Sequence, residues 1–311
     1  MCNAQFILSR EIAGWLTLRR LSGDNVGVRY FSNAGGQLMT TWTHEELHSE
    51  YEKIVLGLQY TIAERERLKA VMHLLGRVSP YGIEVPVSEI TEALLSTSAE
   101  RFQDVFALLL CGAKRDRFFV EFGACDGLVA NNTVMLERRF GWKGILAEPD
   151  RFWRDRLPAN RTAIIDNRCV SSATGEKITF YQSDRPGNSS PDQAHPYLGG
   201  VTDSYEVETV SFLDLLKTHN APKYIDFLSV DTEGHEKAVF SSFDFDQYKF
   251  GFICVEEHEG VGPDDSVVPI IEAAGYRMIY AREEGRPVPM QITGVDKFFV
   301  PNDHPFAAWP P

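Results

Sequence analysis

The stretch FFVEFGACDG, residues 118–127, decides the fold class. It is an apolar run of strand-forming residues that closes on two glycines, and the helical pattern NNTVMLERRFG (131–141) follows it. A turn from a strand into a helix needs glycine where φ is positive or where a ligand approaches the backbone. The helix behind the turn begins with free N–H groups. The stretch therefore predicts a strand, a glycine-rich turn and a helix at one edge of a sheet.

Strands and helices alternate over the rest of the chain. Strand patterns occur in the segments 142–150, 161–171, 177–184, 206–220, 224–236, 250–258, 267–283 and 296–303. The segments 206–220 and 267–283 also contain a helical pattern. Apolar central strands that alternate with helices are typical of a mostly parallel sheet covered on both faces. The sequence therefore predicts an α/β domain, and we place it at residues 86–311.

Residues 1–85 have a different pattern and are predicted to form an accessory region. Short strands are expected in residues 1–42, and apolar residues at spacings of three and four predict a long helix from Thr43 to Arg77. One interpretation is that this helix packs on the main domain, and another is that it forms a homodimer contact. A further helical stretch is expected from Val85 to about Gly112.

Composition excludes several classes of protein. Hydrophobic residues make up 43% of the chain and charged residues 24%, which indicates a globular protein. The formal net charge of −13 argues against a nucleic-acid binder, because such proteins rely on Lys and Arg. No apolar run approaches the roughly 20 residues that span a bilayer, and the start of the chain lacks a signal-peptide pattern. Five cysteines without paired spacing indicate a reducing compartment, so we expect a cytoplasmic protein without a membrane span.

An acidic residue completes the ligand site predicted at the glycine-rich turn. Glu148 ends the next strand about 20 residues after Gly127, where an acidic residue binds ribose hydroxyls. The turn lacks the third glycine of a dinucleotide-binding motif, which favours S-adenosylmethionine, since this cofactor carries adenosine without phosphate. The alternative is that the glycines only close a turn and Glu148 is a solvated strand end.

Three motifs together resemble the FkbM-type family of S-adenosylmethionine-dependent methyltransferases. They are FVEFGACDG (119–127), the Glu148-Pro149 pair, and VDTEGHE (230–236) after the strand YIDFLSV. The resemblance implies a class I methyltransferase fold, which is a Rossmann-like, mostly parallel seven-stranded sheet with helices on both faces. The last strand, here DKFFV (296–300), would run antiparallel. It also implies methyl transfer to a hydroxyl group of a sugar, glycan or natural product.

The resemblance also implies which residues contact the cofactor. Glu121 and Gly123 would line the methionine end, Gly127 would allow close approach, and Glu148 would bind the ribose. The full set of expected contacts is Glu121, Gly123, Ala124, Cys125, Gly127, Asn132, Glu148, Asp166 and Asp231. Many relatives carry Asn where this chain has Cys125, and thiols are poorer hydrogen-bond partners than amides. A non-catalytic interaction protein with this fold is therefore an alternative, and a nicotinamide-dependent oxidoreductase is another.

Candidate catalytic residues follow two neighbouring strands. Asp231 and His235 come after YIDFLSV, and Glu257 and His258 come after FGFICV. A hydroxyl acceptor needs a base, and either His235 or Asp231 could take this role. Alternatively, His235 is a surface residue at a helix start, and part of the segment 256–260 is a solvated loop.

Carboxylates on these two strand ends also suggest a cation. Asp231, Glu256 and Glu257 could bind a divalent ion such as Mg²⁺ through oxygen ligands. A polar loop is expected at 183–205, near the acceptor's entry. His195 and Tyr197 in this loop could contact the substrate, or the loop could simply be mobile.

Overall fold

The computed structural model describes residues 5–7, 14–20, 25–32, 37–43, 86–257, 266–280 and 295–308. The chain divides into two compact units, Met1–Glu66 and Arg67–Pro311. The boundary expected at residue 85 adjoins residues outside the described part and stays a prediction. Among the described residues, every helix is too short or too polar to cross a membrane.

The N-terminal unit contains a four-stranded antiparallel sheet in the order β1-β2-β3-β4. Its strands are β1 (Gln5–Ile7), β2 (Gly14–Arg20), β3 (Asn25–Ser32) and β4 (Gln37–Thr43). Strands were expected in this region. The long helix expected from Thr43 to Arg77, and with it the dimer contact, lies outside the described residues.

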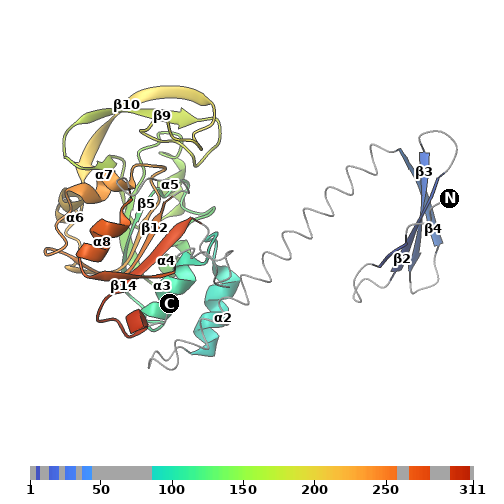
Figure 1. Cartoon of the computed structure of the whole chain (residues 1–311), viewed down its shortest axis with the longest axis horizontal. Coiled ribbons are helices and arrows are strands. Elements are labelled where there is room, and N and C mark those ends of the chain that lie inside the picture. The colour runs from blue at the N-terminus through green and yellow to red at the C-terminus, as the bar shows by residue number, and fades with distance from the viewer. Residues whose placement is uncertain are drawn as a thin grey trace. The chain divides into compact units, whose positions relative to one another are not determined.

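The main unit is built on a seven-stranded sheet in the order β13-β14-β12-β11-β5-β6-β7 (Figure 1). The strands are β5 (Phe118–Phe122), β6 (Lys143–Ala147), β7 (Ile164–Asp166), β11 (Tyr224–Val230), β12 (Lys249–Glu256), β13 (Tyr276–Tyr280) and β14 (Asp296–Pro301). The five strands from β12 to β7 pair in parallel, and β14 is antiparallel to both of its neighbours. The mixed seven-stranded α/β sheet is thus confirmed, with DKFFV antiparallel.

Alternation along the central strands gives the sheet an apolar face on each side. On β5, Phe119 joins one core cluster and its neighbour Val120 joins the other. The first cluster is covered by α2 (Val87–Ser96), α3 (Gln103–Leu110), α4 (Val134–Phe140), α5 (Arg156–Asn160) and the short helix η2 (Pro305–Ala308). The second is covered by α6 (Phe212–Thr218), α7 (Glu236–Ser241) and α8 (Val268–Ala273). Helices on both faces are therefore confirmed for this unit.

The helical stretch expected from Val85 to Gly112 is interrupted. Residues 97–102 separate α2 from α3, and Phe102 adopts a positive φ of 57° directly before α3. Every residue of α3 is buried, so this helix lies inside the unit and not on its surface. The prediction of one helical stretch was therefore wrong at this break. Apolar residues continue through both helices, so the sequence pattern did not mark the interruption.

A second, smaller sheet in the order β8-β10-β9 lies at one end of the main sheet (Figure 1). Its strands are β8 (Cys169–Ser171), β9 (Lys177–Ser183) and β10 (Val201–Ser211). The segment 161–171, expected as one strand, forms β7 in the main sheet and β8 in the small one. The strand pattern at 177–184 likewise belongs to the small sheet. Its half-exposed alternation is typical of antiparallel pairing with one solvated face. The polar loop expected at 183–205 is shorter, because β10 begins at Val201.

Candidate functional site

The carboxyl ends of β5, β6 and β11 border a pocket that is partly open to solvent. The pocket is located where the chain order of the sheet reverses on either side of β5, which is where open α/β sheets bind ligands. It is lined by Phe122, Gly123, Cys125, Ala147, Glu148, Pro149, Asp150, Trp153, Cys169, Val170, Phe180, Gly187, Ser189, Pro191, Asp231, Thr232, Glu233 and His235.

Two glycines of the turn after β5 are required for different reasons. Gly123 has a φ of +83°, and a Cβ there would collide with the carbonyl oxygen of Asp231. This glycine therefore lets the turn after β5 approach the turn after β11, and it lines the pocket. Gly127 has a φ of +76°, and its Cβ would lie 2.5 Å from Cγ of Arg161. Gly127 thus allows packing against the segment after α5 and is outside the pocket lining.

Glu148 is held in a fixed orientation at the tip of β6. Its Oε2 accepts a hydrogen bond from the Cys125 N–H at 2.8 Å, and its Oε1 accepts one from the Asp150 N–H at 2.8 Å. Burial raises the pKa of the Glu148 carboxyl to about 7. The glycine-rich turn and the acidic strand end therefore meet in one pocket, and the Cys125 contact uses the backbone, not the thiol.

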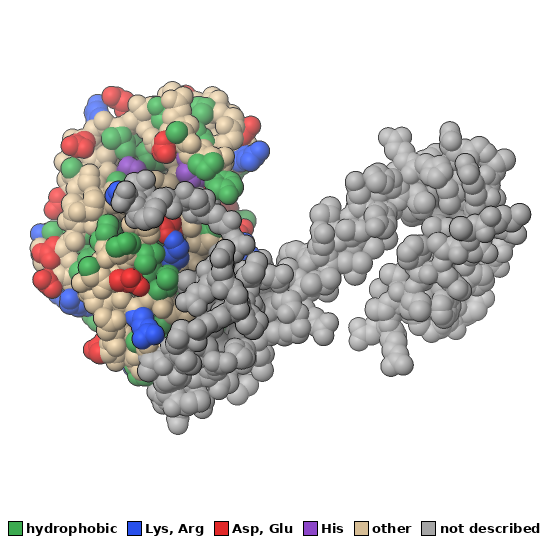
Figure 2. Space-filling model, in the orientation of Figure 1, with side chains coloured by type: hydrophobic (Ala, Val, Ile, Leu, Met, Phe, Trp, Pro, Cys, Tyr) green, Lys and Arg blue, Asp and Glu red, His purple; other side chains and the backbone are tan. Residues whose placement is uncertain are grey.

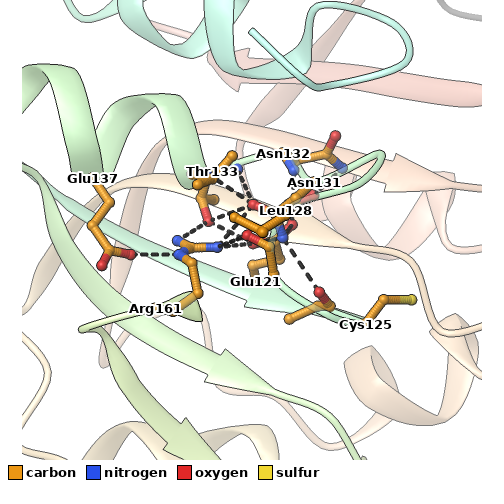
Figure 3. A network of polar contacts seen from close by, with 12 residues as sticks. Glu121, Cys125, Leu128, Asn131, Asn132, Thr133, Glu137 and Arg161 are labelled. Carbon is orange, nitrogen blue, oxygen red and sulfur yellow. Dashed lines mark hydrogen bonds and ion pairs between the residues drawn. The ribbon is translucent and has the colours of Figure 1, made fainter. Parts of the chain in front are cut away.

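Glu121 lies below the turn in a buried network and not in the pocket lining (Figure 3). Its carboxylate accepts hydrogen bonds from the Asn132 N–H at 2.9 Å, from the Asn131 amide at 3.1 Å and from the Thr133 hydroxyl. The guanidinium of Arg161 lies 3.9 Å away and forms a second ion pair, with Glu137, at 2.6 Å. Glu121 thus fixes the loop between the glycine turn and α4.

Three carboxyls gather on the turns after β11 and β12. One oxygen each from Asp231, Glu233 and Glu256 lies within 4.8 Å of the others. Burial, together with the charge of Glu256, raises the pKa of Asp231 well above its usual value. Burial also raises the pKa of Glu233 to about 8 and that of Glu256 to about 7. The group can therefore bind protons near neutral pH and would favour a positively charged ligand.

Two histidines contact this region from different sides. His235 lines the pocket, and its Nε2 lies 3.0 Å from the Ser171 hydroxyl of β8. His195 is buried with Nδ1 3.7 Å from Oε2 of Glu233. Burial lowers the pKa of both, so both are neutral at pH 7. Figure 2 shows histidine side chains along the border between the small sheet and the rest of the unit.

The remaining predicted site residues lie outside the pocket lining. Ala124 is buried in the core, and the Asn132 amide donates to the Ser229 hydroxyl at 2.9 Å. Asp166 binds Arg168 and His219 through its carboxylate. Glu257 forms an ion pair with Lys297 and accepts the Val267 N–H at 3.0 Å. His258 lies outside the described residues. The roles of all these residues stay predictions.

The cation expected at Asp231, Glu256 and Glu257 also stays a prediction. The geometry brings Glu233, not Glu257, beside Asp231 and Glu256.

Several pocket residues were not identified from the sequence. Asp150 directly follows the Glu148-Pro149 pair, and Trp153 follows three residues later, so proximity to that motif could have indicated both. Cys169, Val170 and Phe180 had no such signal, because they reach the pocket only through the small sheet.

We expect the ligand-free protein to lose stability as the pH rises from 7 to 8.5. Glu148, Glu233 and Glu256 have folded-state pKa values of about 7, about 8 and about 7, raised from the ordinary glutamate value of 4.5. The contribution of these carboxyls to the free energy of unfolding is complete below their pKa in the unfolded state. It is lost as the pH rises through their pKa in the folded state. Buried histidines with lowered pKa values change little above pH 7. Thermal unfolding at pH 7 and pH 8.5 measures the effect. Glu148→Gln should reduce the difference between the two unfolding midpoints. A midpoint that rises with pH contradicts the expectation.

Comparison with known proteins places this site in a family. Residues 121–278, more than half of the chain, match the model of the methyltransferase FkbM domain. The hexuronic acid methyltransferase AglP of Haloferax volcanii is 27% identical over 205 residues, which cover 64% of this chain and 80% of that protein. The matched region includes the glycine turn, Glu148 and the segment after β11. The chain therefore belongs to the FkbM methyltransferase family.

Proposed function

We propose that the protein is an S-adenosylmethionine-dependent O-methyltransferase that acts on a hydroxyl group of a sugar or glycan. The observation that carries the proposal is Glu148, which is fixed at the tip of β6 beside the glycine turn in the pocket of an FkbM-family chain. The name of the related hexuronic acid methyltransferase supports a sugar acceptor.

The pocket offers groups suited to each part of the cofactor. Glu148 would accept hydrogen bonds from the ribose hydroxyls, and the apolar side chains of Trp153, Val170 and Phe180 would contact adenine. Gly123 and Cys125 would lie near the methionine part. Asp166, which the resemblance placed among the cofactor contacts, is left out of this assignment, because its carboxylate already binds Arg168 and His219.

S-adenosylmethionine, when bound, supplies a methyl group on a positively charged sulfur. The residues of the chain then hold the acceptor hydroxyl in line with that group and accept its proton. Asp231 takes the proton in this proposal, since it lines the pocket and has a raised pKa next to Glu256. His235, neutral at pH 7 and also in the lining, is the second candidate for the base.

Titration with S-adenosylhomocysteine, the demethylated product, tests the proposal. We expect binding by the wild-type protein and a loss of about 10- to 100-fold in Glu148→Ala, because hydrogen bonds to a charged group contribute roughly 1.5–3 kcal/mol each. Glu272→Ala, an exposed change on α8, should leave the affinity unchanged. Absence of binding by the wild-type protein contradicts the proposed cofactor.

Transfer itself requires an acceptor. A panel of neutral sugars, uronic acids and glycans, followed by mass spectrometry, should show a methylated product on oxygen. Cofactor binding without turnover on any acceptor would favour the non-catalytic alternative.

A further inference from the structure

The small sheet forms one wall of the proposed cofactor pocket. Cys169 and Val170 of β8 and Phe180 of β9 line the pocket. Cys169 and Phe180 also belong to the small sheet's own core, together with Val207 of β10. The position of this wall relative to Glu148 therefore depends on how the small sheet is attached to the turn after β6.

Tyr205 of β10 makes that attachment. Its hydroxyl donates a hydrogen bond to Oδ1 of Asp150 at 2.9 Å and accepts one from the Arg151 N–H at 3.0 Å. Asp150 is buried, lines the pocket and donates its own N–H to Glu148 at 2.8 Å. Asp150 thus links the Tyr205 hydroxyl to the carboxylate proposed to bind the ribose, because its side chain accepts from Tyr205 and its backbone N–H donates to Glu148.

The ring of Tyr205 has two packing partners. The guanidinium of Arg151 lies 4.0 Å from its centroid and also forms an ion pair with Asp203. Phe180, the cross-strand partner on β9, has its ring 5.9 Å away. Burial raises the pKa of Tyr205 further above its usual value, so the hydroxyl remains a donor throughout the ordinary pH range. The hydroxyl is therefore oriented toward Asp150 by packing.

The geometry points to Tyr205 as a positioning residue for the cofactor ribose. Tyr205 acts through Asp150 and Glu148, and it aligns the pocket wall that contains Phe180 with them. Tyr205 is not in the pocket lining, so it acts without touching the ligand. The inference rests on the proposed function, because it assumes that adenosine occupies this pocket.

Tyr205→Phe tests the inference, because it removes only the hydroxyl and keeps both ring contacts. Calorimetry should show about 10-fold weaker binding of S-adenosylhomocysteine, the size expected when one organising hydrogen bond is lost. A 2′,3′-dideoxy analogue of the same ligand should bind the variant and the wild type within about 2-fold. Tyr224→Phe, at the opposite end of β11, is the matched control and should leave both affinities unchanged.

Equal affinity of Tyr205→Phe and wild type for S-adenosylhomocysteine would overturn the inference. So would an equal loss for the dideoxy analogue, which would indicate general damage to the pocket. If Tyr205→Phe unfolds at a lower temperature, Asp150→Ala, which removes the acceptor oxygen, provides the second test. The effects of the two substitutions on affinity should be non-additive, since both act on the same hydrogen bond, and full additivity would reject the link. Failure of the wild type to bind is a separate result that rejects the proposed function instead.

Discussion

Replacing Arg161 by methionine should lower the free energy of unfolding by roughly 3–5 kcal/mol. The guanidinium is fully buried and forms an ion pair with Glu137 at 2.6 Å. It also lies 3.9 Å from Glu121 and donates to the side-chain amide oxygen of Asn131 and to the Thr133 hydroxyl, both at 2.8 Å. Without the guanidinium, the carboxyls of Glu121 and Glu137 lose their cation. Burial raises the pKa of Glu121, and the positive charge of Arg161 opposes this shift.

Urea denaturation without ligand measures this loss. Arg139→Met is the matched control, because Arg139 and its partner Glu92 are both exposed and such pairs contribute less than about 1 kcal/mol. The Arg161 variant should also bind S-adenosylhomocysteine more weakly, since the loop from Gly127 to Thr133 is anchored through this network (Figure 3). Equal denaturation midpoints in the two variants would show that the network contributes little to stability.

The glycine turn and its partners illustrate what local sequence can predict. Gly123 and Glu148 lie at strand ends in recognisable motifs, and the sheet order brings those ends to one edge. Glu121 lies one residue before the end of β5, and the family motif made a cofactor contact plausible. Its observed partner Arg161 lies far along the chain, and no spacing rule connects the two.

Alternation along β12 could have refined the prediction at its end. Neighbouring residues of a strand point to opposite faces, so Glu256 and Glu257 could not both face Asp231. Glu256 approaches Asp231, and Glu257 turns to Lys297 instead. The small sheet could not be predicted in the same way. Its strand β8 has only three residues, one face of the sheet is solvated, and its contribution to the pocket depends on tertiary contacts such as Tyr205 with Asp150.

Asp231→Asn should reduce turnover by about 10²- to 10⁴-fold, the usual contribution of a positioned general base. The substitution keeps the size of the side chain but removes its ability to accept a proton. Affinity for S-adenosylhomocysteine should change by no more than a few-fold, because the proposed contacts to ribose and adenine are made by Glu148, Trp153, Val170 and Phe180. Turnover on an acceptor found in the sugar panel, and calorimetry on the same samples, separate the two effects.

The pH profile distinguishes Asp231 from its neighbours. The ionised carboxylate is the active form of the base, so wild-type turnover should rise with pH through the raised pKa of Asp231. Asp231→Asn should lack this rise, whereas Glu256→Gln, which removes the neighbouring charge that raises this pKa, should lower the pH at which it occurs. His235→Gln serves as the comparison at the second candidate base. If His235→Gln loses turnover and its pH dependence while Asp231→Asn keeps both, the proton is accepted by the imidazole and Asp231 only holds the turn in place.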